Sequence, residues 1–586
     1  MKRYFILFLK TAGLALLSAS ILYFNAFYDV YQLTKTGAVF FFAFLLFSVS
    51  LFTAGRTSFS PGIPGLAAFI FILYLILRTL FSDIPAPSYY LAAVFSPVFV
   101  FAAMYSVFPV KKFLVFINIL AALSVSYAFL QYASGIQRPY SFFGNPIFLS
   151  EFLLINFSLV IISAFYFRKN TFYFTLNALG ILVVMALSSS RGPLISVLIQ
   201  FILLSFILIH NRYISLKKIL LYSFSVFFSA VIISGLLFSV SRDTAFPERF
   251  SPKTLLNSPA FNNRLLMGKT AYALGLKSPV FGSGPGSYKY YHPFYQSFLL
   301  KKDAAREFVN TSYAHNDYMQ YFSEFGIAGL LLFLVFLFAC AARFDASYPY
   351  LEKKHLLISS ALACSLFSVI IESFFNFPLF VLPSAFLFWY YSGLFLKFSF
   401  IRHKTFVFPG EKSIAAGAAV FTAVFIVFSS PFLFSNFYLK HAINLDAANE
   451  PLNEKYFKKS VSLYPSYFYT HYYLGASYSK SLKLRKASES YKKALDIQPY
   501  SPDIHYNLAS VFFKASDYSE SEKYIQKTLS LYPGFIPARL LLVRIYSEQG
   551  NDEAMIKQLS KISEIKPGFI PRNTASETLL FKEITP

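Results

Sequence analysis

Long apolar runs constrain the fold of this chain more than any other feature. A helix of about 20 apolar residues crosses a bilayer, and the chain contains about 13 such runs. They lie near residues 4–26, 37–55, 63–81, 88–108, 111–134, 146–167, 171–190, 192–209, 219–240, 320–342, 355–376, 378–399 and 413–433. Hydrophobic residues make up 56% of the sequence, which is more than an ordinary soluble domain contains. We therefore predict an all-α fold in which a polytopic helical bundle spans a membrane.

The basic residues between the runs predict the orientation of the bundle. If the N-terminus lies in the cytoplasm, most Lys and Arg residues of the short loops fall on the inner side, as the positive-inside rule requires. The opposite short loops then hold little beyond Lys35 and Arg138. This orientation places a long loop, residues 241–314, on the outer side. We expect a transmembrane domain at 1–433, which includes this loop, and an outer domain at 434–586.

The long loop is unusually basic. It contains ten Lys or Arg residues against four acidic residues, in a chain whose formal net charge is +24. Most other basic residues serve the membrane topology, so the net charge does not indicate a nucleic acid partner. An anionic lipid, or an anionic substrate linked to a lipid, is the expected counterpart of the loop.

The region after residue 433 contains an internal repeat. Prolines stand at positions 465, 499, 533 and 567, each 34 residues from the next. In the same register Leu474, Leu508 and Leu542 recur, and an aromatic residue follows each of them four positions later. The period and the pattern resemble those of the tetratricopeptide repeat, in which each unit is a pair of helices. We predict a C-terminal α-solenoid of such repeats, preceded by a degenerate unit at about 434–467.

The stretch "NTSYAHNDYMQYFSEFGIAG" joins the long loop to an apolar span. On a helix that begins near Asn316, the residues Asn316, Gln320 and Ser323 form one polar stripe, with Glu324 beside it. His315 then precedes the helix, where the positive end of the helix dipole favours a neutral imidazole. A neutral imidazole is suited to accept a proton from an attacking hydroxyl group. The alternative interpretation is that His315 and its neighbours only cap the helix.

Two other stretches carry groups that suit an anion. "SSSRG" places Arg191 at the outer end of a span, where its side chain either faces a ligand or extends to the membrane surface. "FGSGPGSY" contains Gly282, Gly284 and Gly286, whose backbone N–H groups either surround an anion or belong to a tight turn. No strand precedes these glycines, so they do not indicate a dinucleotide-binding fold.

These stretches together resemble the O-antigen ligase and polymerase superfamily of bacterial surface-polysaccharide enzymes. The resemblance covers residues 140–400 and rests on "FFGNPIFLSEFLL", "SSSRG", Arg264 followed by "PVFGSGPGSY", and "HNDYMQYFSEFGIAG". Members of the family often carry a Trp shortly after the loop arginine, where this chain has Gly268 and Lys269. This departure concerns the acceptor or the shape of the pocket more than the chemistry.

The resemblance implies glycosyl transfer from an undecaprenyl diphosphate-linked glycan to an acceptor hydroxyl, without a metal or another cofactor. It places the reaction at the periplasmic face of the bacterial inner membrane. By motif, Arg191 and Arg264 hold the diphosphate and His315 activates the acceptor, which is a glycan, a lipid or a protein. The residues expected to support this site are Asn316, Glu324, Gly284 and Gly286. The chemistry is consistent, because two guanidinium groups stabilise a departing diphosphate through paired hydrogen bonds.

Other functions stay open at this point. Polymerase, ligase and protein O-oligosaccharyltransferase activities all use the same donor. A non-enzymatic membrane scaffold for polysaccharide assembly, acting through its repeats, is a second class. A transporter is disfavoured, because Glu151 and Glu372 are the only clear intramembrane acids and no internal symmetry is visible. A metal site that combines His315 with Glu324 is disfavoured too, because the two positions are about half a turn out of phase on a helix.

The repeats are expected to bind a partner on their concave surface, either a periplasmic protein or a glycan. We expect deletion of the residues after about Asn449 to spare glycan transfer and to impair complex formation.

Overall fold

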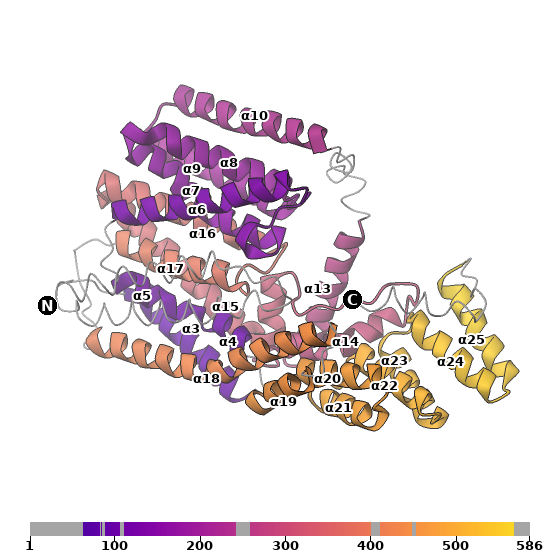
Figure 1. Ribbon diagram of the computed structural model, residues 1–586. Coiled ribbons are helices and arrows are strands. Elements are labelled where there is room, and N and C mark those ends of the chain that lie inside the picture. Colours follow the sequence, from indigo (N-terminus) through magenta and orange to yellow (C-terminus); the bar gives the residue numbers. More distant parts are fainter. Residues whose placement is uncertain are drawn as a thin grey trace. The chain divides into compact units, whose positions relative to one another are not determined.

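A computed structural model describes residues 62–82, 84, 88–105, 110–241, 258–399, 411–447 and 453–567. Its regular structure is helical, with no strand in these ranges, as predicted (Figure 1). Two compact units divide the chain. The membrane unit comprises Met1–Lys289 and Ser312–Asn436, and the repeat unit comprises Tyr290–Thr311 and Phe437–Pro586. The spans predicted at 4–26 and 37–55 lie outside the described residues.

Most helices of the membrane unit are formed by long apolar stretches. The helices of this unit are α3 (Gly62–Leu80), α4 (Ser88–Val94), α5 (Phe99–Tyr105), α6 (Val110–Ala133), α7 (Pro146–Tyr166), α8 (Thr171–Leu187), α9 (Arg191–His210), α10 (Leu216–Ser241), α13 (Pro259–Gly275), α15 (Asp317–Ser347), α16 (Lys353–Glu372) and α17 (Leu382–Phe398). Of these, α4 and α5 are short and α13 is partly polar. Two further helices, α14 (Ser287–Leu300) and α18 (Glu411–Ala447), begin in the membrane unit and continue into the repeat unit.

Eight stretches in the described ranges are long and apolar enough to cross a membrane. They are Gly62–Leu80, Val110–Ala133, Pro146–Tyr166, Arg168–Leu187, Arg191–His210, Leu216–Ser239, Asp317–Tyr350 and Lys353–Glu372. Each of them coincides with one of the predicted spans. The chain is therefore a multi-pass membrane protein.

Three predicted spans differ from the structure. The stretch 88–108 is not one helix, because a turn of 3-10 helix at Ser96–Val98 separates α4 from α5. Pro97 lies in this turn, and Phe95 before it leaves the helical conformation. The stretch 378–399 contains α17, which is shorter than the predicted span. Pro383 is the second residue of this helix. The stretch 413–433 is part of the longer helix α18, which extends to Ala447.

Helix α7 lies at the centre of the membrane unit. It packs against α6, α8, α9, α16 and α17, and most of its side chains are buried. The connections from α7 to α8 and from α8 to α9 are short, so these helices run antiparallel to their neighbours in sequence. The starts of α7 and α9 and the end of α8 therefore lie at one end of the bundle. A hydrogen bond from the Asp317 N–H to the Ser373 carbonyl brings the start of α15 to the end of α16.

A kink interrupts α15 at Gly326, whose φ of 65° and ψ of −171° leave the helical region. The glycine-rich stretch replaces the backbone hydrogen bonds that the kink removes. The N–H groups of Ile327 and Ala328 donate to the carbonyls of Pro279 and Val280, at 2.8 and 3.0 Å. A Cβ atom at Gly326 would lie 2.3 Å from the Val280 carbonyl oxygen. Glycine is therefore required here both for the positive φ and for the close approach.

The repeat unit is built from helical hairpins, as the period of 34 residues predicts. Its helices are α19 (Asn453–Leu463), α20 (Phe468–Lys480), α21 (Leu484–Ile497), α22 (Pro502–Lys514), α23 (Tyr518–Leu531), α24 (Ile536–Glu548) and α25 (Asp552–Ile565). The pairs α20–α21, α22–α23 and α24–α25 pack as hairpins. Pro499 and Pro533 lie in the turns between successive hairpins, and Pro465 lies in the turn between α19 and the first hairpin. The carbonyl oxygen of each such proline bonds to a side chain six residues later, in the pairs Pro465–His471, Pro499–His505 and Pro533–Arg539.

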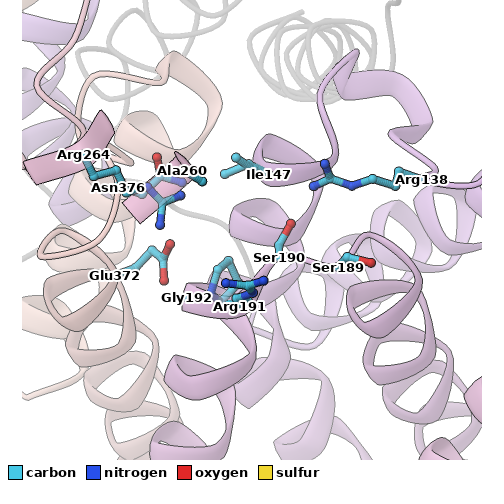
Figure 2. Close-up of a pocket in the computed structure, with 11 residues that line it drawn as sticks. Arg138, Ile147, Ser189, Ser190, Arg191, Gly192, Ala260, Arg264, Glu372 and Asn376 are labelled. Carbon is cyan, nitrogen blue, oxygen red and sulfur yellow. The ribbon is translucent and has the colours of Figure 1, made fainter. Parts of the chain in front are cut away.

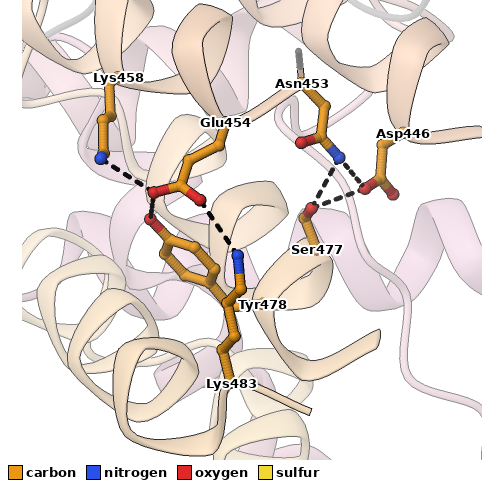
Figure 3. A network of polar contacts seen from close by, with 7 residues as sticks. All are labelled: Asp446, Asn453, Glu454, Lys458, Ser477, Tyr478 and Lys483. Carbon is orange, nitrogen blue, oxygen red and sulfur yellow. Dashed lines mark hydrogen bonds and ion pairs between the residues drawn. The ribbon is translucent and has the colours of Figure 1, made fainter. Parts of the chain in front are cut away.

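A polar network joins α19 to the first hairpin (Figure 3). Glu454 interacts with Lys458 at 2.9 Å, with the Tyr478 hydroxyl at 2.9 Å and with Lys483 at 3.3 Å. These groups, with Lys458 first, lower the pKa of Glu454 to about 2. Because the folded pKa is depressed, this contribution to stability is complete above the ordinary carboxyl pKa and is lost as the pH falls towards 2.

The kink yields a test of the fold. We expect Gly326→Ala to lower the apparent melting temperature of the detergent-solubilised protein by roughly 5 °C or more, because alanine is strained at this φ and meets the Val280 carbonyl. Gly268→Ala in α13 is the matched control, since a Cβ atom there has no neighbour within 4 Å. Equal melting temperatures for the two variants would contradict the assigned role of Gly326.

Candidate functional site

A cavity of about 260 Å³ lies at the end of the membrane unit where α7 and α9 begin and α16 ends. It is lined by Arg138, Ile147, Ser189, Ser190, Arg191, Gly192, Pro193, Ala260, Arg264, Glu372 and Asn376 (Figure 2). These residues lie far apart in the sequence, between positions 138 and 376. Three of them are arginines and one is an acid, so the lining favours a negatively charged ligand.

Tight local structure places Arg191 at this cavity. The three serines before it form the turn between α8 and α9, in which Ser189 has a positive φ of 54°. Ser188 is fully buried and bonds to Ser150 on α7 at 2.6 Å. Only small side chains fit so close to a neighbouring helix. The "SSSRG" stretch therefore fixes Arg191 as the first residue of α9, at the edge of the cavity.

Arg264 reaches the same cavity from α13. The Ser258 side chain caps this helix by accepting a bond from the Phe261 N–H, and Pro259 occupies the first turn. Burial lowers the pKa of Arg264, and the charge of Arg191 acts in the same direction. The negative charges of Glu372 and Glu151 act in the opposite direction. The two sequence-predicted arginines thus lie close enough to repel each other, which an anion between them would relieve.

Arg138 is a third cation at the cavity, and the sequence analysis did not assign it to the site. It lies between α6 and the start of α7, and its Nε donates to the Ser188 carbonyl at 3.0 Å. The adjoining "FFGNP" stretch forms the start of α7. Gly144 adopts a φ of 67°, and the Asn145 side chain caps the helix through the Ile147 N–H at 2.8 Å. Arg138 could have been noticed as an isolated basic residue on a loop otherwise poor in charge.

Glu372 brings α16 against the start of α9. Ser196 donates a hydrogen bond to its carboxylate at 3.2 Å. A Cβ atom at Gly192 would lie 2.7 Å from the nearer carboxylate oxygen. The glycine after Arg191 therefore provides the space that this carboxylate occupies. An acid within an apolar span was the available sequence signal for Glu372.

His315 lies beside Arg264 and Asn376, both of which line the cavity. Its backbone has a positive φ of 51°, which is uncommon for a residue other than glycine. The neighbouring residues over-determine this conformation: the Ala314 N–H donates to Gln320 Oε1 at 2.6 Å, and Asn316 caps α15 through the Met319 N–H. The imidazole also packs edge-on against Phe377 with ring centroids 4.6 Å apart. Such over-determined strain is typical of functional positions.

The protonation of His315 is controlled mainly by burial. Burial lowers the pKa of His315 to about 4, and the charge of Arg264 contributes in the same direction. The neutral imidazole agrees with the sequence prediction, but the physical cause is different. Asn316, not His315, is the N-cap of α15, and desolvation rather than the helix dipole is the largest cause.

Asn376 connects His315 to a buried acid. Its Nδ2 donates to Glu151 Oε1 at 2.7 Å, which leaves the amide oxygen for another partner. The Asn376 side chain also interacts with the imidazole of His315. His315 Nδ1 and Asn376 Oδ1 are both buried, and neither has a partner at conventional hydrogen-bond geometry in the described residues. Asn376 and Glu151 were not predicted as site residues, although Glu151 was noted as an intramembrane acid.

The start of α15 is fixed on the end of α16 by further hydrogen bonds. Asp317 Oδ2 accepts from the Ser373 hydroxyl at 2.7 Å and from the Leu379 N–H at 3.1 Å. The Tyr318 hydroxyl donates to the Ile370 carbonyl at 2.7 Å. This attachment determines where His315, two residues before Asp317, lies.

Glu324 and the glycines Gly284 and Gly286 lie together, next to α15. The Glu324 carboxylate accepts hydrogen bonds from the Tyr90 hydroxyl at 2.6 Å and from the Gly286 N–H at 3.1 Å. Its backbone carbonyl accepts from the Gly284 N–H at 2.9 Å. These N–H groups point at α15, so the glycine-rich stretch forms a structural turn and does not present them to an anion in this structure. None of the three residues lines the cavity.

Within the described ranges, no group of three or more His, Cys, Asp or Glu side chains is arranged to hold a metal ion.

Comparison with known proteins gives a family for this segment of the chain. Residues 176–334 match the family model described as O-antigen ligase. We call this matched stretch the ligase segment. Arg191, Arg264 and His315 all lie within it. A tetratricopeptide repeat model matches residues 483–516, so both parts of the resemblance stated from the sequence are confirmed. The ligase segment supports an activity of the O-antigen ligase or polymerase type.

No curated relative matches the chain. Several solved structures are similar at low identity. A crystal structure of MamA has 21% identity over 28% of this chain and 96% of that chain, with a TM-score of 0.22. PilF of Pseudomonas aeruginosa has 13% identity over 42% of this chain and 98% of that chain, with a TM-score of 0.21. The Cut9–Hcn1 tetramer of APC/C has 14% identity over 80% and 96%, with a TM-score of 0.23.

The environment of His315 predicts its titration. Histidine C2-hydrogen exchange followed by mass spectrometry is expected to report a midpoint near pH 4 for His315. In Arg264→Gln the midpoint should rise, because the positive charge that disfavours the imidazolium is removed. A wild-type midpoint between pH 6 and 7, or no upward change in the variant, would contradict the described surroundings.

Proposed function

We propose that this protein transfers a glycan from an undecaprenyl diphosphate carrier to an acceptor hydroxyl, without a metal ion. The ligase segment supports the class of reaction. The observation that carries the proposal is the convergence of Arg138, Arg191 and Arg264 on one cavity, with His315 beside it. A scaffold without enzymatic activity does not require such an arrangement.

The arginines bind and stabilise the leaving group in this proposal. A guanidinium group donates two parallel hydrogen bonds to phosphate oxygens and remains charged even when it is partly buried. As the bond between the sugar and the diphosphate breaks, negative charge increases on the diphosphate. Fixed cations at that position stabilise the transition state more than the ground state. Arg138 extends the pair expected from the sequence to three cations.

His315 acts as the general base. The acceptor oxygen attacks the anomeric carbon and loses its proton to the imidazole, while the bond to the diphosphate breaks and the carrier leaves with the electron pair. The low pKa of His315 keeps the imidazole able to accept that proton at neutral pH. Buried Nδ1 faces the amide oxygen of Asn376 in our interpretation, so Nε2 is the atom that accepts the proton.

Glu151 and Asn376 position the base. The bond from Asn376 to Glu151 fixes the amide so that its oxygen is directed at the imidazole. This arrangement would select the Nδ1–H tautomer of His315, which is the role of the third member in other base-containing triads.

We further propose that the cavity and the repeats face the periplasm, at the outer surface of the bacterial inner membrane. A lipid-linked donor of this class is assembled into surface polysaccharide on that side. The repeats would then bind a periplasmic protein or a glycan, since tetratricopeptide repeats generally serve protein interaction.

Replacement of the base tests the mechanism. We expect His315→Ala to reduce glycan transfer at least about 100-fold, while donor binding and protein abundance stay close to wild type. The measurement is transfer of a lipid-linked glycan to acceptor by the purified protein in lipid nanodiscs. His210→Ala, at the opposite end of α9, is the control and should retain activity. Retained transfer in His315→Ala would remove this residue from the base role.

Conservative replacement of an arginine tests the diphosphate site. Arg191→Lys should weaken binding of the lipid-linked donor about 10-fold, because an ammonium group cannot form the paired hydrogen bonds of a guanidinium. Arg168→Lys, an exposed substitution at the other end of the bundle, should bind the donor as wild type does. Equal dissociation constants for the two variants, measured by titration with the donor, would argue against a diphosphate at Arg191.

A further inference from the structure

The repeat unit contains a piece of the long loop. Residues Tyr290–Thr311 belong to this unit, although about 125 residues separate them from Phe437, where the rest of the unit begins. We call them the inserted segment. In the sequence they lie between the glycine-rich turn, which ends at Gly286, and His315.

The inserted segment has its own compact structure. It starts with the remaining turns of α14 and ends in a stretch without regular structure at 308–311. The fully buried Gln296 joins α14 to this stretch. Its side chain accepts a hydrogen bond from the Val309 N–H at 2.9 Å and donates one to the Val309 carbonyl at 3.2 Å. His292, which is also buried, lies 3.5 Å from the Thr311 N–H. The two parts of the segment are thus hydrogen-bonded to each other, and the second part continues directly into Ser312.

One inter-repeat turn holds the helical part of the inserted segment. Gln498 donates a hydrogen bond to the Tyr290 carbonyl at 3.2 Å. The ring of Tyr500 lies among the rings of Tyr290, Tyr291 and Phe294, with centroid distances of 5.6, 5.8 and 5.2 Å. Three aromatic contacts on one side chain bury a large apolar area in a small space.

The next inter-repeat turn holds the second part. Tyr532 packs against Phe308 with centroids 5.4 Å apart, and its hydroxyl is hydrogen-bonded to the Phe308 backbone. A Cβ atom at Gly534 would lie 2.2 Å from the carbonyl oxygen of Ala304. The backbone of the segment therefore approaches this turn as closely as a glycine permits.

The two turns that contact the inserted segment occupy equivalent positions in successive repeats. Residues 498–500 and 532–534 are 34 residues apart, and each set surrounds one of the recurrent prolines. Each turn is also stabilised by the helix that follows it. The carbonyl of its proline accepts a hydrogen bond from His505 in one turn and from Arg539 in the other. The repeats thus offer two rigid, regularly spaced contacts, and the inserted segment is bound to both.

We propose that the repeats bind the inserted segment as an intramolecular ligand and thereby position the chain that carries His315. This inference rests on the proposed function. Three residues separate the end of the segment from His315, and three separate its start from Gly286, so the segment constrains both neighbouring motifs. The repeats are then a part of the catalytic assembly. This reverses the expectation from the sequence that deletion after about Asn449 spares transfer.

The test compares equivalent turns in the full-length protein. Gly534→Leu forces the Ala304 carbonyl away, and Tyr500→Ala removes the aromatic contacts. Ser466→Leu makes the same change as Gly534→Leu at the exposed equivalent position two repeats earlier, and serves as the matched control. Hydrogen–deuterium exchange of peptides covering 304–311 is measured together with the rate of glycan transfer and the affinity for the lipid-linked donor.

We expect both docking variants to raise exchange of 304–311 at least about 10-fold and to slow transfer about 10- to 100-fold, with donor affinity unchanged. Ser466→Leu should change none of these. Exchange in α22 and α24 must stay at the wild-type level, which shows that the repeats remain folded. Unchanged exchange at 304–311 would refute the docking, and faster exchange with wild-type transfer would refute the positioning role. If the wild-type protein transfers no glycan, the proposed function fails, while the exchange data still decide whether the repeats hold the segment.

Discussion

The attachment of α15 to the end of α16 is the interaction on which the candidate site depends. Asp317 is fully buried and accepts hydrogen bonds from Ser373 and from the Leu379 N–H. A buried carboxylate is retained only where such partners are present, because its desolvation is expensive. This attachment places His315 beside Asn376 and Arg264, so the location of the imidazole is determined by an acid that takes no part in the proposed reaction.

The second constraint is the excess of positive charge at the cavity. Three guanidinium groups share the lining with one carboxylate in the described part of the chain. Glu372 offsets part of their repulsion and joins α16 to the start of α9, but it does not neutralise the cavity. Folding alone gives little reason to collect like charges in a partly buried place, since each of them loses hydration. The arrangement therefore supports the proposal of an anionic ligand with more than one charge.

Much of this organisation could be predicted from the sequence. Eight of the spans were predicted from the length of the apolar stretches, because bilayer thickness dictates helix length directly. The repeats were predicted from the spacing of the prolines, because each repeat is one structural unit. The break near Pro97 was missed, since a long apolar stretch conceals a proline that ends a helix. Motifs predicted Arg191, Arg264 and His315 as candidate site residues. Asn376 could not be found in this way, because its role comes from packing between α15 and α16 and not from any local pattern.

The glycine-rich turn is a second feature that the sequence predicted only in part. The sequence allowed its N–H groups to face an anion or to close a turn, and both interpretations require glycine. The structure directs the N–H groups of Gly284 and Gly286 at Glu324, and it needs glycine at positions 282 and 326 for close backbone contact. The motif therefore indicated a need for glycine, but it could not identify the partner of the N–H groups.

Docking across two consecutive repeats also couples the evolution of two distant parts of the gene. The distance along the segment from Phe294 to Ala304 has to match the rise of the solenoid from one proline turn to the next. An insertion in the segment, or a change in the pitch of the repeats, would lose one contact unless the other part changed with it. Homologues in which the loop and the solenoid vary in length should therefore vary in both together.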